Sequence, residues 1–536
     1  MKGAALVPPA APADATLPGR AASLLQAALE QTRGSPSLAR VHAALETALS
    51  HVGQPMRVAV VGRIKAGKST LLNALLGEEL LAAGTEELTF NVNRLRHAVA
   101  PSLLVHFKDG RPSEHRDPGE LEALTRRCEE NLAFLSSIRC IDVSHPNPIL
   151  RAFDLIDTPG LRSFFAEDAR NTLEFLGQRE AEIDADAVTR TEAAGADALL
   201  FLFQGGVSRP DRELLTAFLG PLLGHATPVT AIGVMTKVDT FWAQGGDPAV
   251  DGPRLARDWA ADPQLRDVFY DVYPVAGLLG LGAQRLTPAE LSRLADLSRL
   301  PEERLAQLLR SASAFCRREH DDVTVPAAER AELWNRIGQY GCWRACAVLR
   351  AEPGLGHAAL SERLLAESGI PAVREVVSSH FGARAAAIKV SAAVEPLAAL
   401  CHLEKQRLKG SCRRAVEELA GRLERFAAEE QALAELVLLR AHYQGRLDFN
   451  PEEVVHLLQV TGERGTSLTA RLGLGDDLPT DVSSLITRAR ERLGYWQVRA
   501  NDFLVPREST QAADAMTRAY ERIFHRVEQI VVLLRG

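Results

Sequence analysis

Three features that mark other protein classes are scarce or missing in this sequence of 536 residues. Its seven cysteines are scattered and odd in number, which argues against a disulfide framework and indicates a reducing cytosol. No apolar run reaches the roughly 18 residues that a membrane-spanning helix needs, so we expect no segment to cross a bilayer. The net charge is −7 and no basic block stands out, so we expect no nucleic-acid partner.

What remains is an ordinary globular composition, with 46% hydrophobic and 24% charged residues. The length suggests roughly two to four domains. Residues 1–20 are rich in alanine and proline. The prolines interrupt any apolar stretch, so we expect a flexible tail rather than a signal peptide.

One segment carries specific chemistry, because Gly62-Arg-Ile-Lys-Ala-Gly-Lys-Ser69 matches the phosphate-binding pattern GxxxxGK[ST]. Apolar residues before it predict a strand, and those after it predict the start of a helix. In that setting Lys68 reaches the β- and γ-phosphates, while Ser69 places its hydroxyl on Mg²⁺. The residues expected around the phosphates are Gly62, Ala66, Gly67, Lys68, Ser69 and Thr70. The sequence therefore predicts a nucleoside triphosphate site.

A second motif, Asp157-Thr-Pro-Gly160, follows the apolar run Phe153–Ile156. A carboxylate at the end of a buried strand can hold the water shell of Mg²⁺, so Asp157 is a candidate metal ligand. The N–H of Gly160 can then contact the γ-phosphate and sense its presence. The alternative interpretation is an ordinary β-turn.

A third motif indicates guanine. Thr236-Lys-Val-Asp239 follows another apolar run, and Asp239 can accept hydrogen bonds from the N1 and N2 donors that adenine lacks. We expect the stem of Lys237 to lie over the base and Thr236 to belong to the same site. Ala276 and Gly277 stand where a base-contacting loop should be, and we expect only backbone contacts from them.

The threonine that senses the γ-phosphate should lie between the phosphate-loop helix and the next strand. Thr85 and Thr89 are the candidates, and Thr89 is preferred because the strand-like segment 90–95 follows it directly. We expect Thr89 to contact both Mg²⁺ and the γ-phosphate. At least one of the two threonines then merely caps a turn.

The order of the elements predicts the fold class. From residue 56 to about 285 apolar strands alternate with helices, which predicts a mostly parallel sheet with helices on both faces, as in an α/β P-loop GTPase domain. Ligands of such sheets bind at the carboxyl ends of the strands, where all these motifs fall. Beyond residue 285 helical periodicity predicts an all-α bundle that forms a neck or stalk. The domains expected are 1–20 (tail), 21–54 (helices joining the neck), 55–285 (GTPase) and 286–536 (neck and stalk).

With these motifs in place, the chain resembles the bacterial dynamin-like GTPases, and among them the isoniazid-inducible proteins of mycobacteria. The resemblance includes the DTPG and TKVD motifs, the segment 78–89, and two helical segments at 364–370 and 465–473. It implies GTP hydrolysis, dimerisation or oligomerisation with GTP, a second dynamin-like protein as a possible partner, and an anionic membrane surface. It also implies a cytoplasmic protein attached peripherally to the inner face of the cell membrane.

Position 161 is leucine, where small signalling GTPases place a glutamine that orients water. Charge in the transition state must then be neutralised by another group. The resemblance to large GTPases suggests Lys65, and less strongly Arg63, inside the phosphate loop. The alternative is a solvated lysine without a catalytic role.

A membrane contact is expected near residues 396–414. Basic residues gather there around Gly410, with apolar side chains between them, and they are Lys405, Arg407, Lys409, Arg413 and Arg414. At a hairpin tip each charge could contribute ~1 kcal/mol of attraction to anionic headgroups. The alternative is a solvated helix face.

Two other functions fit the same motifs. A soluble GTP-gated switch or assembly factor, as in ribosome maturation, would share the phosphate loop. Such proteins usually add a basic RNA-binding module, but the GxxG at Gly462–Gly465 lacks the setting of a KH fold. A GTPase without activity, serving a second dynamin-like protein, is the third possibility.

Overall fold

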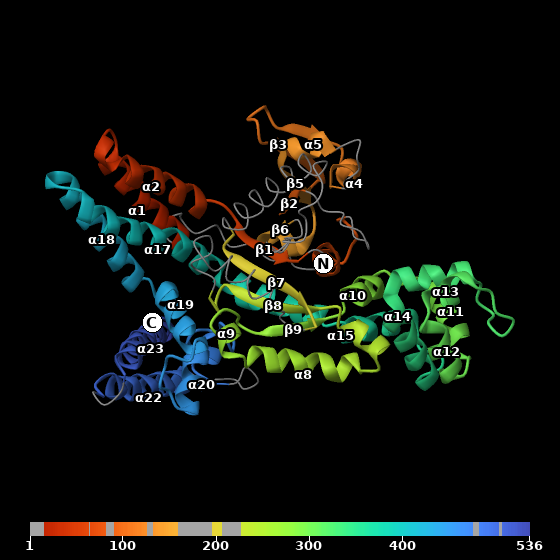
Figure 1. The fold of residues 1–536 in the computed structure, drawn as a ribbon. Helices are drawn as coiled ribbons and strands as arrows, with labels where there is room; N and C mark the ends of the chain where they lie inside the picture. Colours follow the sequence, from red (N-terminus) through yellow and green to blue (C-terminus); the bar gives the residue numbers. More distant parts are fainter. Residues whose placement is uncertain are drawn as a thin grey trace. The chain divides into compact units, whose positions relative to one another are not determined.

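The computed structural model describes residues 16–63, 65–81, 91–125, 132–158, 196–205, 227–474, 482–502 and 506–535 (Figure 1). The chain forms two compact units. One comprises residues 56–382, and the other joins residues 16–55 to residues 383–536. Each unit has its own architecture.

The first unit is built around a mixed sheet. Among the described residues the strands are β1 (Met56–Gly62), β2 (Val92–His97), β3 (Ser102–Phe107), β4 (Glu114–Arg116), β5 (Ile138–His145), β6 (Phe153–Asp157), β7 (Ala198–Gln204), β8 (Ala231–Thr236) and β9 (Val272–Val275). Their order in the sheet is β4-β3-β5-β2-β6-β1-β7-β8-β9. In the order of the sheet, β6, β1, β7, β8 and β9 run parallel to one another, whereas β2 pairs antiparallel with β6. The predicted α/β fold is confirmed.

Burial explains which strands could be predicted from the sequence. Residues 58–61 of β1 are fully buried, and every residue of β8 is buried. Strands of a parallel sheet are covered on both faces and therefore read as continuous apolar runs. At the antiparallel end, β3 alternates buried and half-buried residues, because one of its faces is less covered.

Helices complete the first unit. They are α3 (Lys68–Leu76), α4 (Leu121–Thr125), α5 (Leu132–Ser137), α8 (Pro248–Ala260), α9 (Pro263–Arg266), α10 (Gly277–Gln284), α11 (Pro288–Ser298), α12 (Glu302–Leu309), α13 (Ala312–Arg317), α14 (Ala327–Ala351), α15 (His357–Glu367) and α16 (Ile370–Val376), with a π-helical turn at Val377–Gly382. One hydrophobic core contains Phe201 of the sheet together with Leu294 and Leu364 of these helices.

The boundary between the units therefore lies near residue 382 and not near 285, where the helical region was predicted to separate. Helices α11 to α15 share the core of the sheet instead of joining the other unit. Glycines in α10 make this packing possible. A Cβ on Gly282 would lie 2.0 Å from the carbonyl oxygen of Arg336, so the two backbones meet directly.

The second unit is entirely helical in its described part. It contains α1 (Leu17–Thr32), α2 (Ala39–Val52), α17 (Ala383–Arg407), α18 (Gly410–Glu429), α19 (Gln431–Tyr443), α20 (Pro451–Val460), α21 (Leu468–Arg471), α22 (Val482–Ala500) and α23 (Arg507–Arg535). Helix α17 packs against α1, α2 and α18 in one group, and α22 pairs with α23 in another (Figure 1). Two ion pairs connect the N-terminal hairpin of α1 and α2 to the later helices of this unit. Arg20 lies 2.7 Å from Glu430, and Arg40 lies 2.8 Å from Glu404.

One described helical stretch, Ile370–Arg407, has the length and mean hydropathy (1.4) of a membrane span, and 44% of the window concerned is buried. Core helices of globular proteins have the same properties. Length and hydropathy alone therefore do not identify a span here.

Candidate nucleotide-binding site

The phosphate loop connects the end of β1 to the start of α3. Gly62 is required by the neighbouring strand, since a Cβ there would lie 2.6 Å from the carbonyl oxygen of Leu202. Gly67 precedes the helix with a φ of 91°, a left-handed conformation that glycine adopts without strain. The loop thus brings its backbone N–H groups and the N-terminus of α3 to one place, which is an arrangement that binds phosphate.

Lys68 supplies the positive charge of this loop. Its side chain is buried, and its Nζ donates to the carbonyl oxygens of Gly62 and Arg63, both at 3.2 Å. The ammonium group is thereby held against the concave loop, where a P-loop lysine meets the β- and γ-phosphates.

Oxygen ligands suited to Mg²⁺ meet beside the loop. The Ser69 hydroxyl donates to Oδ2 of Asp157 at 3.3 Å, and Asp157 is fully buried at the end of β6. The hydroxyl of Thr158 donates to the carbonyl oxygen of Val60 at 2.7 Å and fixes this strand end beside β1. A hydroxyl and a carboxylate next to a phosphate loop are the hard donors that Mg²⁺ takes together with nucleotide oxygens. Gly160, Thr85 and Thr89 lie outside the described residues.

Thr236 supports the loop from the neighbouring strand β8. Its hydroxyl oxygen lies 2.7 Å from the carbonyl oxygen of Ala66 and 3.1 Å from that of Phe203, so its one hydrogen is committed to protein acceptors. The structure therefore gives the side chain of Thr236 a contact with the phosphate loop itself.

Two lysines in the site have a strained backbone. Lys65 has a φ of 62° and Lys237 a φ of 58°, and among the described residues no other non-glycine residue has a positive φ. Such a conformation costs about 1–2 kcal/mol for a residue with a Cβ, and it clusters at functional sites. Burial lowers the pKa of Lys237; the charge of Asp239 opposes this fall, and the charge of Lys65 adds to it. The two ammonium groups are thus close enough to repel each other, and a polyphosphate would relieve that repulsion.

Asp239 follows Lys237 at the start of a 3₁₀ turn (Val238–Gln244). Burial raises the pKa of this carboxyl group, while its own backbone N–H and Lys237 oppose the rise. A carboxylate with little solvent around it forms strong hydrogen bonds to donors such as guanine N1 and N2, and it tolerates their absence poorly.

The loop expected to contact the base is completed by residues far away in the sequence. The N–H of Ala276 donates to the carbonyl oxygen of Ser368 at 2.9 Å, so this N–H serves the protein. Gly277 begins α10, and a Cβ there would lie 3.5 Å from Cγ2 of Thr70. Gly369 has a φ of 77°, and a Cβ there would lie 2.1 Å from the carbonyl oxygen of Pro274. The junction of α15 and α16 therefore forms part of this edge.

Arg374 and Gln284 hold the other end of the phosphate-loop helix, and sequence reasoning did not identify them. Nε of Arg374 donates to Leu75 O at 2.9 Å, and its Nη2 donates to Ala74 O at 2.7 Å. Nε2 of Gln284 donates to Ala74 O at 2.9 Å. A guanidinium at a helix C-terminus satisfies free carbonyls and complements the helix dipole.

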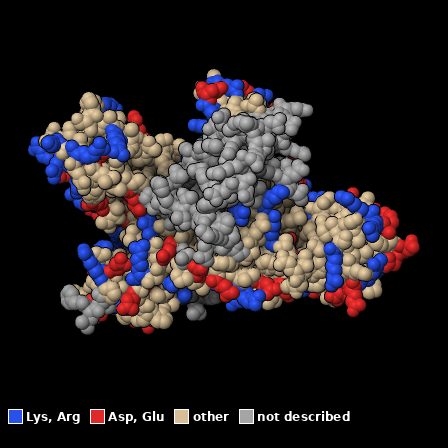
Figure 2. Space-filling view, in the orientation of Figure 1, with Lys and Arg blue, Asp and Glu red and all other residues tan. Residues whose placement is uncertain are grey.

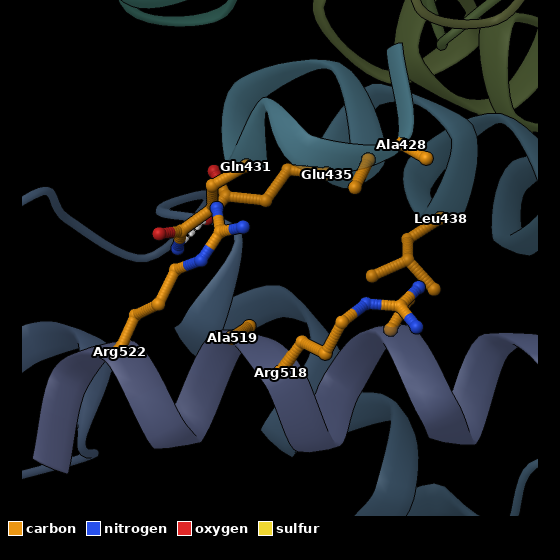
Figure 3. Close-up of a pocket in the computed structure, with 9 residues that line it drawn as sticks. Ala428, Gln431, Glu435, Leu438, Arg518, Ala519 and Arg522 are labelled. Atoms are coloured by element: carbon orange, nitrogen blue, oxygen red, sulfur yellow. Dashed lines mark hydrogen bonds between the residues drawn. The ribbon is translucent and has the colours of Figure 1, made fainter. Parts of the chain in front are cut away.

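Two other groups of side chains do not resemble a nucleotide site. A small pocket lies between α18, α19 and α23, where Arg522 extends toward Gln431 and Arg518 toward Leu438 (Figure 3). It has room for roughly one water molecule. Its carboxylate, Glu435, already accepts hydrogen bonds from Gln431 at 2.6 Å and from Arg471 at 2.9 Å.

The second group is His106, Cys140 and Asp142 on strands β3 and β5, whose possible ligand atoms lie within 4.8 Å of one another. Arg96 lies 3.0 Å and Arg94 3.6 Å from the carboxylate oxygens of Asp142. These guanidinium groups already balance the carboxylate and would repel a cation, so we interpret the cluster as a charge network.

Comparison with known proteins finds similarity to dynamin-like proteins. Residues 58–216 match the profile of the Dynamin family. The chain is 27% identical to the isoniazid-induced protein IniC of Mycobacterium tuberculosis over 509 residues, which cover 94% of this chain and 97% of that protein. It is 32% identical to a bacterial dynamin-like protein of Nostoc punctiforme over 22% of this chain and 18% of that protein. A solved structure of an oligomerised bacterial dynamin pair aligns with 96% of this chain and 74% of its own, at 12% identity and a TM-score of 0.31.

Proposed function

We propose that the chain carries a GTPase domain similar to those of the Dynamin family, and that it uses GTP and Mg²⁺ to drive a cycle of self-association on an anionic membrane surface. The single observation behind this proposal is the meeting of Lys68, Ser69 and Asp157 at the carboxyl edge of the parallel sheet. Asp239 stands at the same edge, just after β8, which is two strands beyond β1 in the sheet.

Each residue has a distinct task in the proposed reaction. Lys68 and the N–H groups of the loop bind the β- and γ-phosphates, and Asp239 selects guanine. Ser69, Asp157 and Thr89 would hold Mg²⁺, which when bound neutralises charge on the phosphate oxygens. Because position 161 is leucine, we assign charge compensation at the γ-phosphate to Lys65.

Dimerisation across the nucleotide is proposed from the similarity to dynamin-like proteins. If it activates hydrolysis, GTP turnover per molecule will rise with protein concentration. A similar rise upon addition of a second dynamin-like protein would identify a mixed dimer. Turnover that is independent of concentration would favour a soluble GTP-gated switch.

The membrane contact is assigned to the end of the helical group formed by α1, α2, α17 and α18. Two turns meet there, since Ser35 Oγ and Cys412 Sγ lie 3.8 Å apart. Lys and Arg side chains gather on this end of the group (Figure 2). Lys405, Lys409 and Arg414 form no ion pair with another described residue, so their charges are available. At ~1 kcal/mol each, they could attract anionic headgroups at the inner face of the cell membrane.

Sedimentation with liposomes tests this assignment. We expect the protein to sediment with phosphatidylglycerol vesicles more than with phosphatidylcholine vesicles, and the variant K405E/R407E/K409E to stay in the supernatant. The matched control R257E/R310E/R317E changes the net charge equally on the other unit and should still sediment. Equal behaviour of the two triple variants would contradict the assignment, whereas GTP turnover in solution should persist in both.

The nucleotide site has its own test. Lys68→Ala should abolish binding of a fluorescent GTP analogue, and Asp239→Asn should reduce the preference for GTP over ATP. If micromolar GTP affinity remained in Lys68→Ala, the site would lie elsewhere.

A further inference from the structure

Two neighbouring strands each hold one of two consecutive carbonyl groups of the phosphate loop. Nε2 of Gln204, at the end of β7, donates to the carbonyl oxygen of Lys65 at 2.6 Å. The hydroxyl of Thr236, at the end of β8, lies 2.7 Å from the carbonyl oxygen of Ala66. Gln204 and Thr236 are direct partners in the register of the two strands. The peptide groups after Lys65 and Ala66 are thus fixed from the same side.

The backbone conformation of Lys65 requires stabilising contacts of this kind. It has a φ of 62°, a region that a residue with a Cβ leaves unless its surroundings prevent it. Its side chain is exposed, so packing does not hold it in place. The hydrogen bond from the N–H of Ala66 to the carbonyl oxygen of Arg63, at 3.1 Å, closes a turn around it. The bond from Gln204 is the described contact that acts on the carbonyl of Lys65 itself.

We infer that Gln204 is a positioning residue for GTP hydrolysis, which holds Lys65 in its left-handed conformation so that the ammonium group stays directed at the bound phosphates. The inference rests on the proposed catalytic role of Lys65. When the carbonyl is released, the peptide can rotate toward negative φ and carry the side chain away from the γ-phosphate. Phosphate binding itself depends on Lys68 and on the backbone N–H groups, so nucleotide affinity should change little.

Single-turnover GTP hydrolysis and equilibrium binding of a fluorescent GTP analogue separate these effects. Gln204→Ala should lower the hydrolysis rate about five- to ten-fold, as expected for the loss of one positioning hydrogen bond, while the Kd changes less than about two-fold. Gln204→Glu has nearly the same shape but offers only acceptors, so it should show the same loss. Gln511→Ala, at an exposed glutamine of α23, is the matched control and should leave both quantities unchanged.

The Lys65→Gly background gives the decisive comparison, because glycine adopts the left-handed conformation without help. Lys65→Gly should slow hydrolysis, and Gln204→Ala should have no further effect in that background. An equal loss in both backgrounds would overturn the inference, since Gln204 would then act on its own. It would also be overturned if Gln204→Ala weakened binding as much as it slowed hydrolysis, or left the rate unchanged while Lys65→Gly lowered it. An unaltered rate in Lys65→Gly would refute the role of Lys65 itself, and the inference with it.

Discussion

Replacing Arg374 by methionine should destabilise the unit of residues 56–382, the GTPase unit, by about 2–3 kcal/mol. The guanidinium donates to Leu75 O at 2.9 Å and to Ala74 O at 2.7 Å, and methionine keeps the apolar stem but neither bond. Ala74 O retains the bond from Gln284 Nε2, so the main losses are the bonds to Leu75 O and to Gln284 Oε1. A hydrogen bond from a charged donor contributes about 1.5–3 kcal/mol, and part of the favourable interaction with the helix dipole is lost as well.

Urea unfolding followed by tryptophan fluorescence measures this effect. Four of the five tryptophans lie between residues 242 and 343, so the signal reports mainly on the GTPase unit. Arg363→Met is the control, because Arg363 is exposed and pairs only with Glu352 among the described residues. If the two variants unfolded at the same urea concentration, Arg374 would not stabilise the phosphate-loop helix as argued.

Three further predictions concern other contacts. Thr236→Val should weaken GTP binding about five-fold, because a buried hydrogen bond to the phosphate loop is lost. The control Thr240→Val, at an exposed hydroxyl, should leave the Kd for GTP unchanged in an equilibrium titration. Gly369→Ala should lower the melting temperature measured by calorimetry and weaken GTP binding, since a Cβ would lie 2.1 Å from Pro274 O. Unchanged values would show that the close contact of Gly369 with Pro274 is not required. Burial lowers the pKa of His456 from 6.5 to about 4, so the folded state binds its proton less readily than the unfolded state. The free energy of unfolding that neutral His456 contributes is fully present above pH 6.5 and is lost as the pH falls toward 4, by about 3 kcal/mol in total. His456→Phe should therefore flatten the plot of unfolding free energy against pH in this range.

The parts of the site that the sequence predicts are those whose chemistry is local. The strand before Gly62 and the helix after Gly67 stand where the motif placed them, because a loop of this kind needs both neighbours within a few residues. The approach of Ser69 to Asp157 also fits the pattern, since Ser69 lies in the first turn of the helix that follows β1 and Asp157 ends the adjacent strand β6. Their roles with nucleotide and metal remain predictions.

The supporting contacts had no such local signal. Arg374 is 299 residues away from the carbonyl of Leu75 that it holds, and Ser368 is also distant in the sequence from its partner Ala276. Gln204 offered a weak signal, as an exposed polar residue at the end of an otherwise buried strand at the ligand edge. Strand β5 was not expected, because polar residues interrupt its sequence, and the boundary at residue 285 was wrong for helices that share the core of the sheet.

The shared unit of residues 16–55 and 383–536 imposes an order on synthesis. At roughly 5–20 residues per second, the ribosome needs roughly 20–60 seconds between releasing the first hairpin and beginning the helix that packs on it. During this interval the apolar side chains Leu25 and Leu45, fully buried in the finished protein, lack the packing that α17 later gives to α1 and α2. The GTPase unit can fold meanwhile, because its chain is continuous. The nascent chain is therefore expected to contain a folded GTPase unit and a hairpin that has not yet packed against α17. At this stage a chaperone or a neighbouring chain could bind the hairpin.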